Sequence, residues 1–112
     1  MSVKETNKID GMGIEENTNS LVFLIADPYA WELDEYDHLK TMQTKINNYV
    51  GYIENKGYLS VYPDRHFDGF RIEAALKYPP TKAGVSFFEA GKQQLKDRNI
   101  AFTYTVIEKK EK

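Results

Sequence analysis

The stretch Ser20 to Asn55, SLVFLIADPYAWELDEYDHLKTMQTKINNYVGYIEN, decides the fold because it joins an apolar strand to an amphipathic helix. Its first part, LVFLIA, is an apolar run of strand length, which is typical of a central strand. From Tyr36 onward the apolar period becomes helical, and the polar residues, Lys45 among them, lie off the stripe. The stripe consists of Leu39, Met42, Ile46, Tyr49, Val50 and Ile53. We therefore predict a helix from about Glu35 to Asn55.

Both ends of this helix carry boundary signals. Asp34 followed by Asp37 resembles a capping box in which aspartates replace the usual residues. Gly57, just after Lys56, is able to adopt a positive φ beyond the last turn. In the acidic entrance to the helix, we expect Trp31 to fold back as a lid over the edge of the core.

The residues before this stretch predict a β-hairpin. Residues 8–15 (KIDGMGIE) form its first strand, and residues 16–19 form a short polar turn. Gly11 and Gly13 lie inside that strand, so they indicate a β-bulge or a close backbone approach and not a phosphate-binding loop.

The residues after the helix predict two or three more strands and a second helix. Residues 58–62 (YLSVY) are a short strand candidate, and residues 70–78 alternate as a half-buried strand does. Residues 81–98 predict a helix, with Ser86 and Glu89 as a rival capping box and Asn99 as a left-handed stop. Residues 100–107 alternate again and form the last strand.

This order of elements predicts an α+β, two-layer sandwich of the order ββα(β)βαβ. We expect a mostly antiparallel sheet of four or five strands with both helices on one face. The single domain covers residues 8–107, and residues 1–7 and 108–112 are expected to be disordered tails.

Composition excludes several classes of protein. The 112-residue chain has no cysteine, so it has no disulfide framework, thiolate nucleophile or Cys-based metal site. No apolar run is long enough to cross a membrane and no secretory segment precedes the fold, which predicts a cytoplasmic protein. The basic residues of the second predicted helix lack interleaved aromatic residues, so nucleic acid is not an expected partner. No motif implies a cofactor, and none establishes an enzyme.

Charge is divided unevenly along the chain. Residues 1–37 hold two lysines against nine acidic residues, a net charge of −7, whereas residues 38–112 carry +5. The first hypothesis is therefore a non-enzymatic protein-interaction module that presents the acidic, aromatic-rich segment Asp27 to Asp37 to a basic protein partner. Small acidic domains that act as toxin-neutralising immunity proteins offer an analogy. The candidate partner-binding residues are Tyr29, Trp31, Glu32, Asp34, Glu35 and Tyr36.

The alternative is a divalent-metal-binding domain or a metal-assisted hydrolase. Asp34 and His38 are four residues apart and share a helix face, and the loop with Asp64 and His66 can fold back towards them. The competing interpretation is structural, because carboxylates in a first helical turn are favoured by the helix dipole.

The last predicted strand leaves self-association open. Its outward positions, Ala101, Thr103, Thr105 and Ile107, carry no charge. A second copy of the chain covering that face or edge is a plausible arrangement, so a homodimer remains a hypothesis.

Several of these motifs together resemble a family of small, uncharacterised bacterial proteins of about this length. The matching elements lie within residues 8–63 and are Asp27, Trp31, His38-Leu39, Gln43-x-Lys45-Ile46-Asn47-x-Tyr49, Ile53-Glu54 and Gly57. The resemblance implies a stand-alone domain of unknown function and supplies no functional residues.

Overall fold

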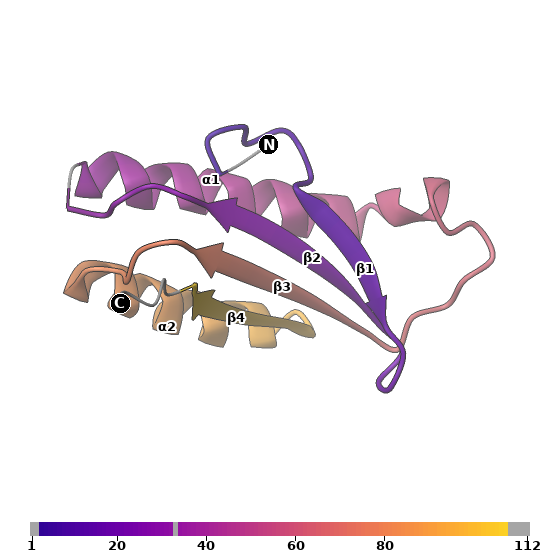
Figure 1. Ribbon diagram of the computed structural model, residues 1–112. Coiled ribbons are helices and arrows are strands. Elements are labelled where there is room, and N and C mark those ends of the chain that lie inside the picture. Colours follow the sequence, from indigo (N-terminus) through magenta and orange to yellow (C-terminus); the bar gives the residue numbers. More distant parts are fainter. Residues whose placement is uncertain (1–2, 33, 108–112) are drawn as a thin grey trace, which may run out of the picture.

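The computed structural model describes residues 3–32 and 34–107, which fold into one four-stranded sheet and two α-helices (Figure 1). This confirms the predicted α+β class. The predicted tail at residues 108–112 lies outside the described residues. The elements are β1 (Gly11–Glu15), β2 (Ser20–Asp27), α1 (Glu35–Glu54), the 3-10 helix η1 (Gly57–Ser60), β3 (Gly69–Leu76), α2 (Lys82–Lys96) and β4 (Ile100–Val106).

The sheet is mixed, so the prediction of a mostly antiparallel sheet was wrong. Its strand order is β1-β2-β3-β4, in which β1 runs antiparallel to β2 while β3 is parallel to both of its neighbours. The physical reason lies in the connections. A long helix between two strands returns the chain to the end of the sheet where it started, and the next strand must then run parallel to the last.

The two faces of the sheet differ in cover. The register places Met12, Phe23, Ile72 and Phe102 in one row across the four strands, and all four pack in the core. In Figure 1 both helices lie behind the sheet. Phe23 contacts Tyr49 of α1 and Phe102 contacts Phe88 of α2, so this row belongs to the face that the helices cover. The opposite face carries small or uncharged residues on β4 and an ion pair on β3. The burial of this one row thus agrees with the expectation that both helices lie on one face of the sheet.

Gly11 fits the close-approach interpretation and not the bulge. The β1–β2 register is continuous from Gly11, opposite Leu24, to Glu15, opposite Ser20. A Cβ atom at Gly11 would lie 3.2 Å from the Leu24 side chain. The glycine therefore leaves room for a leucine on the uncovered face.

The helix boundaries agree with the predicted positions, but their caps differ. Asp34 precedes α1 without a side-chain cap hydrogen bond, whereas Thr81 Oγ1 accepts a hydrogen bond of 3.1 Å from the Gly84 amide at the start of α2. The rival start at Ser86 is therefore wrong. Asn99 adopts φ 64°, which confirms the predicted left-handed stop. No helix of the described chain has the length and apolar character needed to cross a membrane.

Residues 58–62 do not form a strand. Lys56, and not Gly57, takes the left-handed conformation after α1, and the chain then tightens into η1. Gly57 is needed for another reason, because a Cβ atom there would lie 2.6 Å from the Tyr52 ring. Tyr58 is buried against Phe67 and Phe70. An aromatic cluster beyond the end of α1 thus takes the place of the predicted strand.

The N-terminal residues are packed, contrary to the expected tail over residues 1–7. Val3 is buried, and its amide donates a 2.7 Å hydrogen bond to the Ala26 carbonyl at the end of β2. Asn48 of α1 donates to the Thr6 carbonyl at 2.8 Å. From Val3 onward the segment is therefore part of the fold, while residues 1–2 lie outside the described chain.

A buried lysine holds this segment on α1. The Lys45 side chain is fully buried, and its ammonium donates to the Glu5 and Lys8 carbonyls at 2.7 Å each and to the Asp10 carboxylate at 2.9 Å. A charge removed from water is tolerated only when it is paired and hydrogen-bonded, as it is here. The prediction that Lys45 lies off the buried stripe was wrong.

The same cluster completes the edge of β2 beyond the end of β1. The second Asp10 oxygen accepts from the Ala26 amide at 2.9 Å, and the Tyr49 hydroxyl donates to the Leu24 carbonyl at 2.6 Å. The Asp10 amide in turn donates to the Tyr49 hydroxyl at 2.8 Å. Because β1 starts only at Gly11, opposite Leu24, the Asp10 carboxylate satisfies the Ala26 amide, which would otherwise be left without a partner strand.

Replacing Lys45 should test how much this cluster stabilises the fold. Lys45→Met keeps most of the buried volume but leaves the Asp10 carboxylate unpaired, so we expect a loss of about 3–5 kcal/mol in the free energy of unfolding, measured with urea. Lys40→Met, on the exposed side of the same helix, should change it by less than about 0.5 kcal/mol. Similar losses in the free energy of unfolding for the two variants would show that the buried ammonium contributes no more to stability than an exposed one.

Tyr49 should make stability depend on pH in alkali. Burial raises the pKa of its phenol above the ordinary value of about 10. The unfolded chain then loses this proton first, so the contribution is complete below about pH 10 and falls above it by up to about 1.4 kcal/mol per pH unit. Urea unfolding at about pH 9 and pH 11 should show a smaller decrease in Tyr49→Phe than in wild type. Tyr36→Phe, at an exposed tyrosine, should keep the wild-type decrease; an unaltered decrease in Tyr49→Phe would contradict the assignment.

Candidate binding site

A buried aspartate–histidine pair joins the end of β2 to the first turn of α1. His38 Nε2 lies 2.6 Å from Asp27 Oδ2, and both side chains are almost completely shielded from solvent. An ionised carboxylate only accepts hydrogen bonds, so Nε2 carries the proton and donates it. The other Asp27 oxygen accepts from the Tyr29 amide at 3.2 Å. The carboxylate therefore orients the imidazole and also holds the turn that leads to α1.

Trp31 covers this pair. Its ring is stacked on the His38 imidazole with a centroid distance of 3.8 Å and an interplanar angle of 8°. The indole is 0% exposed and contacts Phe88 edge to face. A Cβ atom at Gly84 would lie 3.1 Å from the indole, so this glycine admits the large ring beneath α2. The expectation that Trp31 acts as a packed lid is confirmed.

A cavity of about 570 Å³ opens beside the buried pair, between the N-terminal segment and the entrance to α1. His38 Nδ1 has no hydrogen-bond partner in residues 3–32 and 34–107, and His38 lines the cavity. Because Nε2 holds the proton, a neutral His38 presents Nδ1 as a hydrogen-bond acceptor. The lining residues are Val3, Lys4, Thr6, Tyr29, Ala30, Asp34, Asp37, His38 and Thr41.

The cavity wall combines acceptors with an aromatic face. Asp34 and Asp37 place two carboxylates on the α1 side, and both residues are exposed to solvent. On the other side, the Lys4 ammonium lies 4.2 Å from the centroid of the Tyr29 ring. This contact shows that the Tyr29 face accommodates a cation, as aromatic faces do through their quadrupole.

The residues predicted to bind a partner differ in how far the fold exposes them to solvent. Glu32 and Asp34 are exposed, and Tyr36 is 73% exposed, so these three are accessible at the surface. Tyr29 and Glu35 are half-buried. Trp31, also in the predicted set, has no accessible surface and belongs to the core.

The residues of the metal hypothesis are not brought together. His38 contacts Asp27 at the end of β2, whereas the His66 carbonyl accepts from the Asn19 side chain just before β2 begins. The eight residues of β2 separate these two points by roughly 25 Å. Within residues 3–32 and 34–107, no three His, Asp or Glu side chains gather as metal ligands. Asp34 with His38 and Asp64 with His66 therefore lie near opposite ends of the sheet, and the predicted four-residue site is not formed.

Two important contacts were missed by the sequence reasoning. It considered Asp34 as the neighbour of His38, but the true partner, Asp27, is eleven positions away and ends the preceding strand. A carboxylate directly after an apolar strand was the available signal, because functional side chains gather at the carboxyl ends of parallel strands. For Lys45, the signal was its position between Met42 and Tyr49 on the buried stripe.

These features define a small α+β domain with a mixed sheet and a cavity at the entrance to its first helix. The chain belongs to the family of unknown function DUF6572, which matches residues 1–108. The match extends well beyond the resemblance at residues 8–63. No curated protein and no solved structure matches the chain.

Proposed function

We propose that the protein is a non-enzymatic interaction module that binds a cationic side chain of a basic protein partner in the cavity at the entrance to α1. The observation that carries the proposal is the cavity itself, in which an unpartnered His38 nitrogen and the carboxylates of Asp34 and Asp37 face the same space. This proposal places the binding on Tyr29, Asp34 and Tyr36 and leaves the buried Trp31 as support.

The chemistry of the wall selects the ligand. Carboxylates and a neutral imidazole nitrogen are acceptors, so they favour a group that carries several N–H donors and a positive charge. The Tyr29 ring already carries the Lys4 ammonium on its face, which shows that this wall accepts a cation, and the exposed Tyr36 ring next to Asp37 in the sequence offers apolar contact area. A lysine or arginine side chain meets all of these conditions.

The net charge of −7 over residues 1–37 supports the same proposal. A field of one sign raises the rate at which an oppositely charged partner is encountered, and salt weakens it. The Asp27–His38 pair serves this function by fixing the imidazole that forms one wall. A cytoplasmic location agrees with the proposal, although binding does not depend on it.

Binding can be tested with short amidated peptides that carry one lysine or one arginine. We expect shifts in the ¹⁵N–¹H NMR spectrum centred on Tyr29, Asp37 and His38, and a dissociation constant that rises with salt. Asp34→Asn with Asp37→Asn should weaken binding by about tenfold, because two solvent-exposed ion pairs together contribute on the order of 1–2 kcal/mol.

The matched control is Glu89→Gln on α2 with Asp97→Asn just after it, which removes the same charge from exposed positions outside the cavity. This double variant should bind the peptides with nearly wild-type affinity. Equal weakening of binding by both double variants would show that the effect comes from the overall charge of the protein and not from the cavity. The absence of shifts at the cavity with both peptides would overturn the proposed function.

A further inference from the structure

The strand β4 forms one edge of the sheet and is open to a further strand. It pairs with β3 along its whole length, from Ile100 opposite Phe70 to Val106 opposite Leu76, and has no partner on its other side within residues 3–32 and 34–107. Edge strands are usually protected by charges, prolines, bulges or a cover. The sequence IAFTYTV contains no charge and no proline, and its register is continuous. This edge is therefore unprotected.

A groove lies beside β4, lined by residues of α2 and, near the start of the strand, also by residues of β2 and β3. A cavity of about 500 Å³ borders the first half of β4 and continues into a second of about 230 Å³, because both are lined by Lys92, Phe102 and Thr103. The floor is aromatic: Phe88 stacks on Tyr104 with a centroid distance of 4.5 Å and lies against Phe102. The groove therefore offers apolar surface beside free backbone hydrogen-bonding groups.

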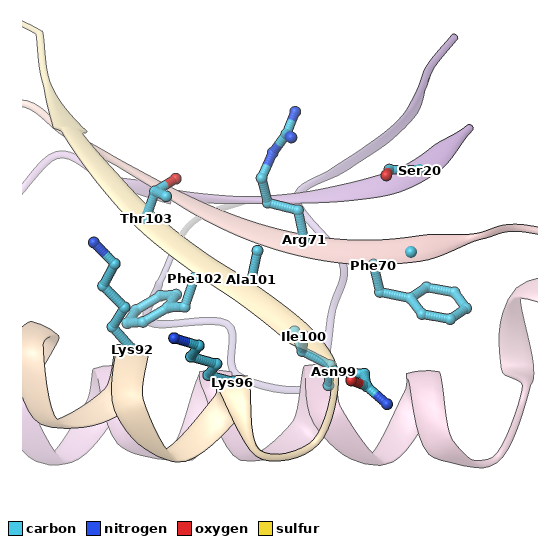
Figure 2. A pocket seen from close by; sticks show the side chains of 11 residues that line it. Ser20, Phe70, Arg71, Lys92, Lys96, Asn99, Ile100, Ala101, Phe102 and Thr103 are labelled. Carbon is cyan, nitrogen blue, oxygen red and sulfur yellow. The ribbon is translucent and has the colours of Figure 1, made fainter. Parts of the chain in front are cut away.

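The rim of the groove is basic near the start of β4. Figure 2 shows Lys92 and Lys96 projecting from α2 on one side of β4, with Arg71 on the other side. Arg71 is paired with Glu73 at 2.8 Å, but Lys92 and Lys96 are exposed and enter no ion pair with the described residues. Two cations are thus available beside the first half of an open strand edge, whereas the acidic Glu89 lines the smaller cavity farther along β4.

The spacing of these cations matches an extended chain. Lys92 and Lys96 are four residues apart on α2, a rise of about 6 Å. Residues i and i+2 of a strand lie about 6.6 Å apart, and their side chains point to the same face of the sheet. Acidic side chains at alternate positions of an added strand would therefore meet the two lysines in register.

We propose that the free edge of β4 binds an extended acidic segment of a protein partner as a fifth strand. Backbone hydrogen bonds to β4 provide the affinity, and two acidic side chains separated by one residue pair with Lys92 and Lys96. This surface is distinct from the proposed α1 cavity, because it lies at the opposite edge of the sheet and selects the opposite charge.

A second copy of the chain fits this edge less well. Pairing of two β4 strands about a twofold axis would bring the α2 helices of both copies to the same side of a continuous sheet. Lys92 and Lys96 of each copy would then face the same cations of the other. The charge of the rim thus favours an acidic partner over a homodimer.

The test uses an acetylated and amidated peptide in which glutamates alternate with valines. We expect binding by isothermal titration and slower hydrogen exchange of the β4 amides that point away from β3. A peptide with lysines in place of the glutamates should not bind. A third peptide, N-methylated at alternate residues so that one backbone edge cannot donate, should also fail to bind, because strand addition requires those donors.

Lys92→Gln with Lys96→Gln should weaken binding of the glutamate peptide about tenfold, as expected for the loss of two charge pairs. Lys40→Gln with Lys56→Gln removes the same charge elsewhere and should have little effect. Equal binding of the N-methylated peptide, or an unchanged affinity in the Lys92/Lys96 variant, would overturn the proposal. It would also be overturned if the protein alone were dimeric in scattering with its outward β4 amides already protected.

Discussion

The interaction on which the rest of the structure depends is the buried ammonium of Lys45. One carboxylate and two backbone carbonyls surround it, and each of these acceptors belongs to the segment that precedes β1. These hydrogen bonds hold the polar N-terminal segment against α1. Lys45 also orients Asp10, which accepts a hydrogen bond from the Ala26 amide near the C-terminal end of β2, beyond the last residue paired with β1. Because that end of β2 carries Asp27, the same interaction supports the strand end from which the candidate site is built.

The sequence was sufficient to predict both helices and four of the strands, but it was insufficient to predict the directions in which the strands run. The helical period of residues 35–55 and the alternation in residues 70–78 and 100–107 follow from burial of one face, and burial acts locally along the chain. Strand direction depends instead on where a helix returns the chain, which no local pattern records. The segment at residues 58–62 shows the same limit, since Tyr58 is buried by Phe67 and Phe70 from beyond the loop.

The candidate site was predictable in location but not in its contacts. The acidic segment before α1 coincides with the region in which the cavity lies, and Trp31 was expected to be a lid. The partners of His38 and Lys45 were not predictable, because Asp27 and Asp10 approach them only after β2 and the N-terminal segment have packed on α1. Buried polar pairs of this kind depend on tertiary geometry, whereas apolar periodicity shows only which face of an element is inside. The polar contacts that matter most here are long-range in sequence.

The parallel pairing of β2 with β3 has a consequence for how the chain folds. The hairpin β1–β2 closes across only a few residues, but Ser20 meets Gly69 only when about fifty residues have been brought together. Closing so long a loop costs chain entropy before any pairing is gained, so we expect the central pair to form after the hairpin. Until then the apolar β2 strand, with Leu21, Phe23 and Ile25, is covered only by its hairpin partner on one edge. The step that we expect to limit folding is therefore the closure of this long loop, since a helix of the size of α1 forms within about a microsecond.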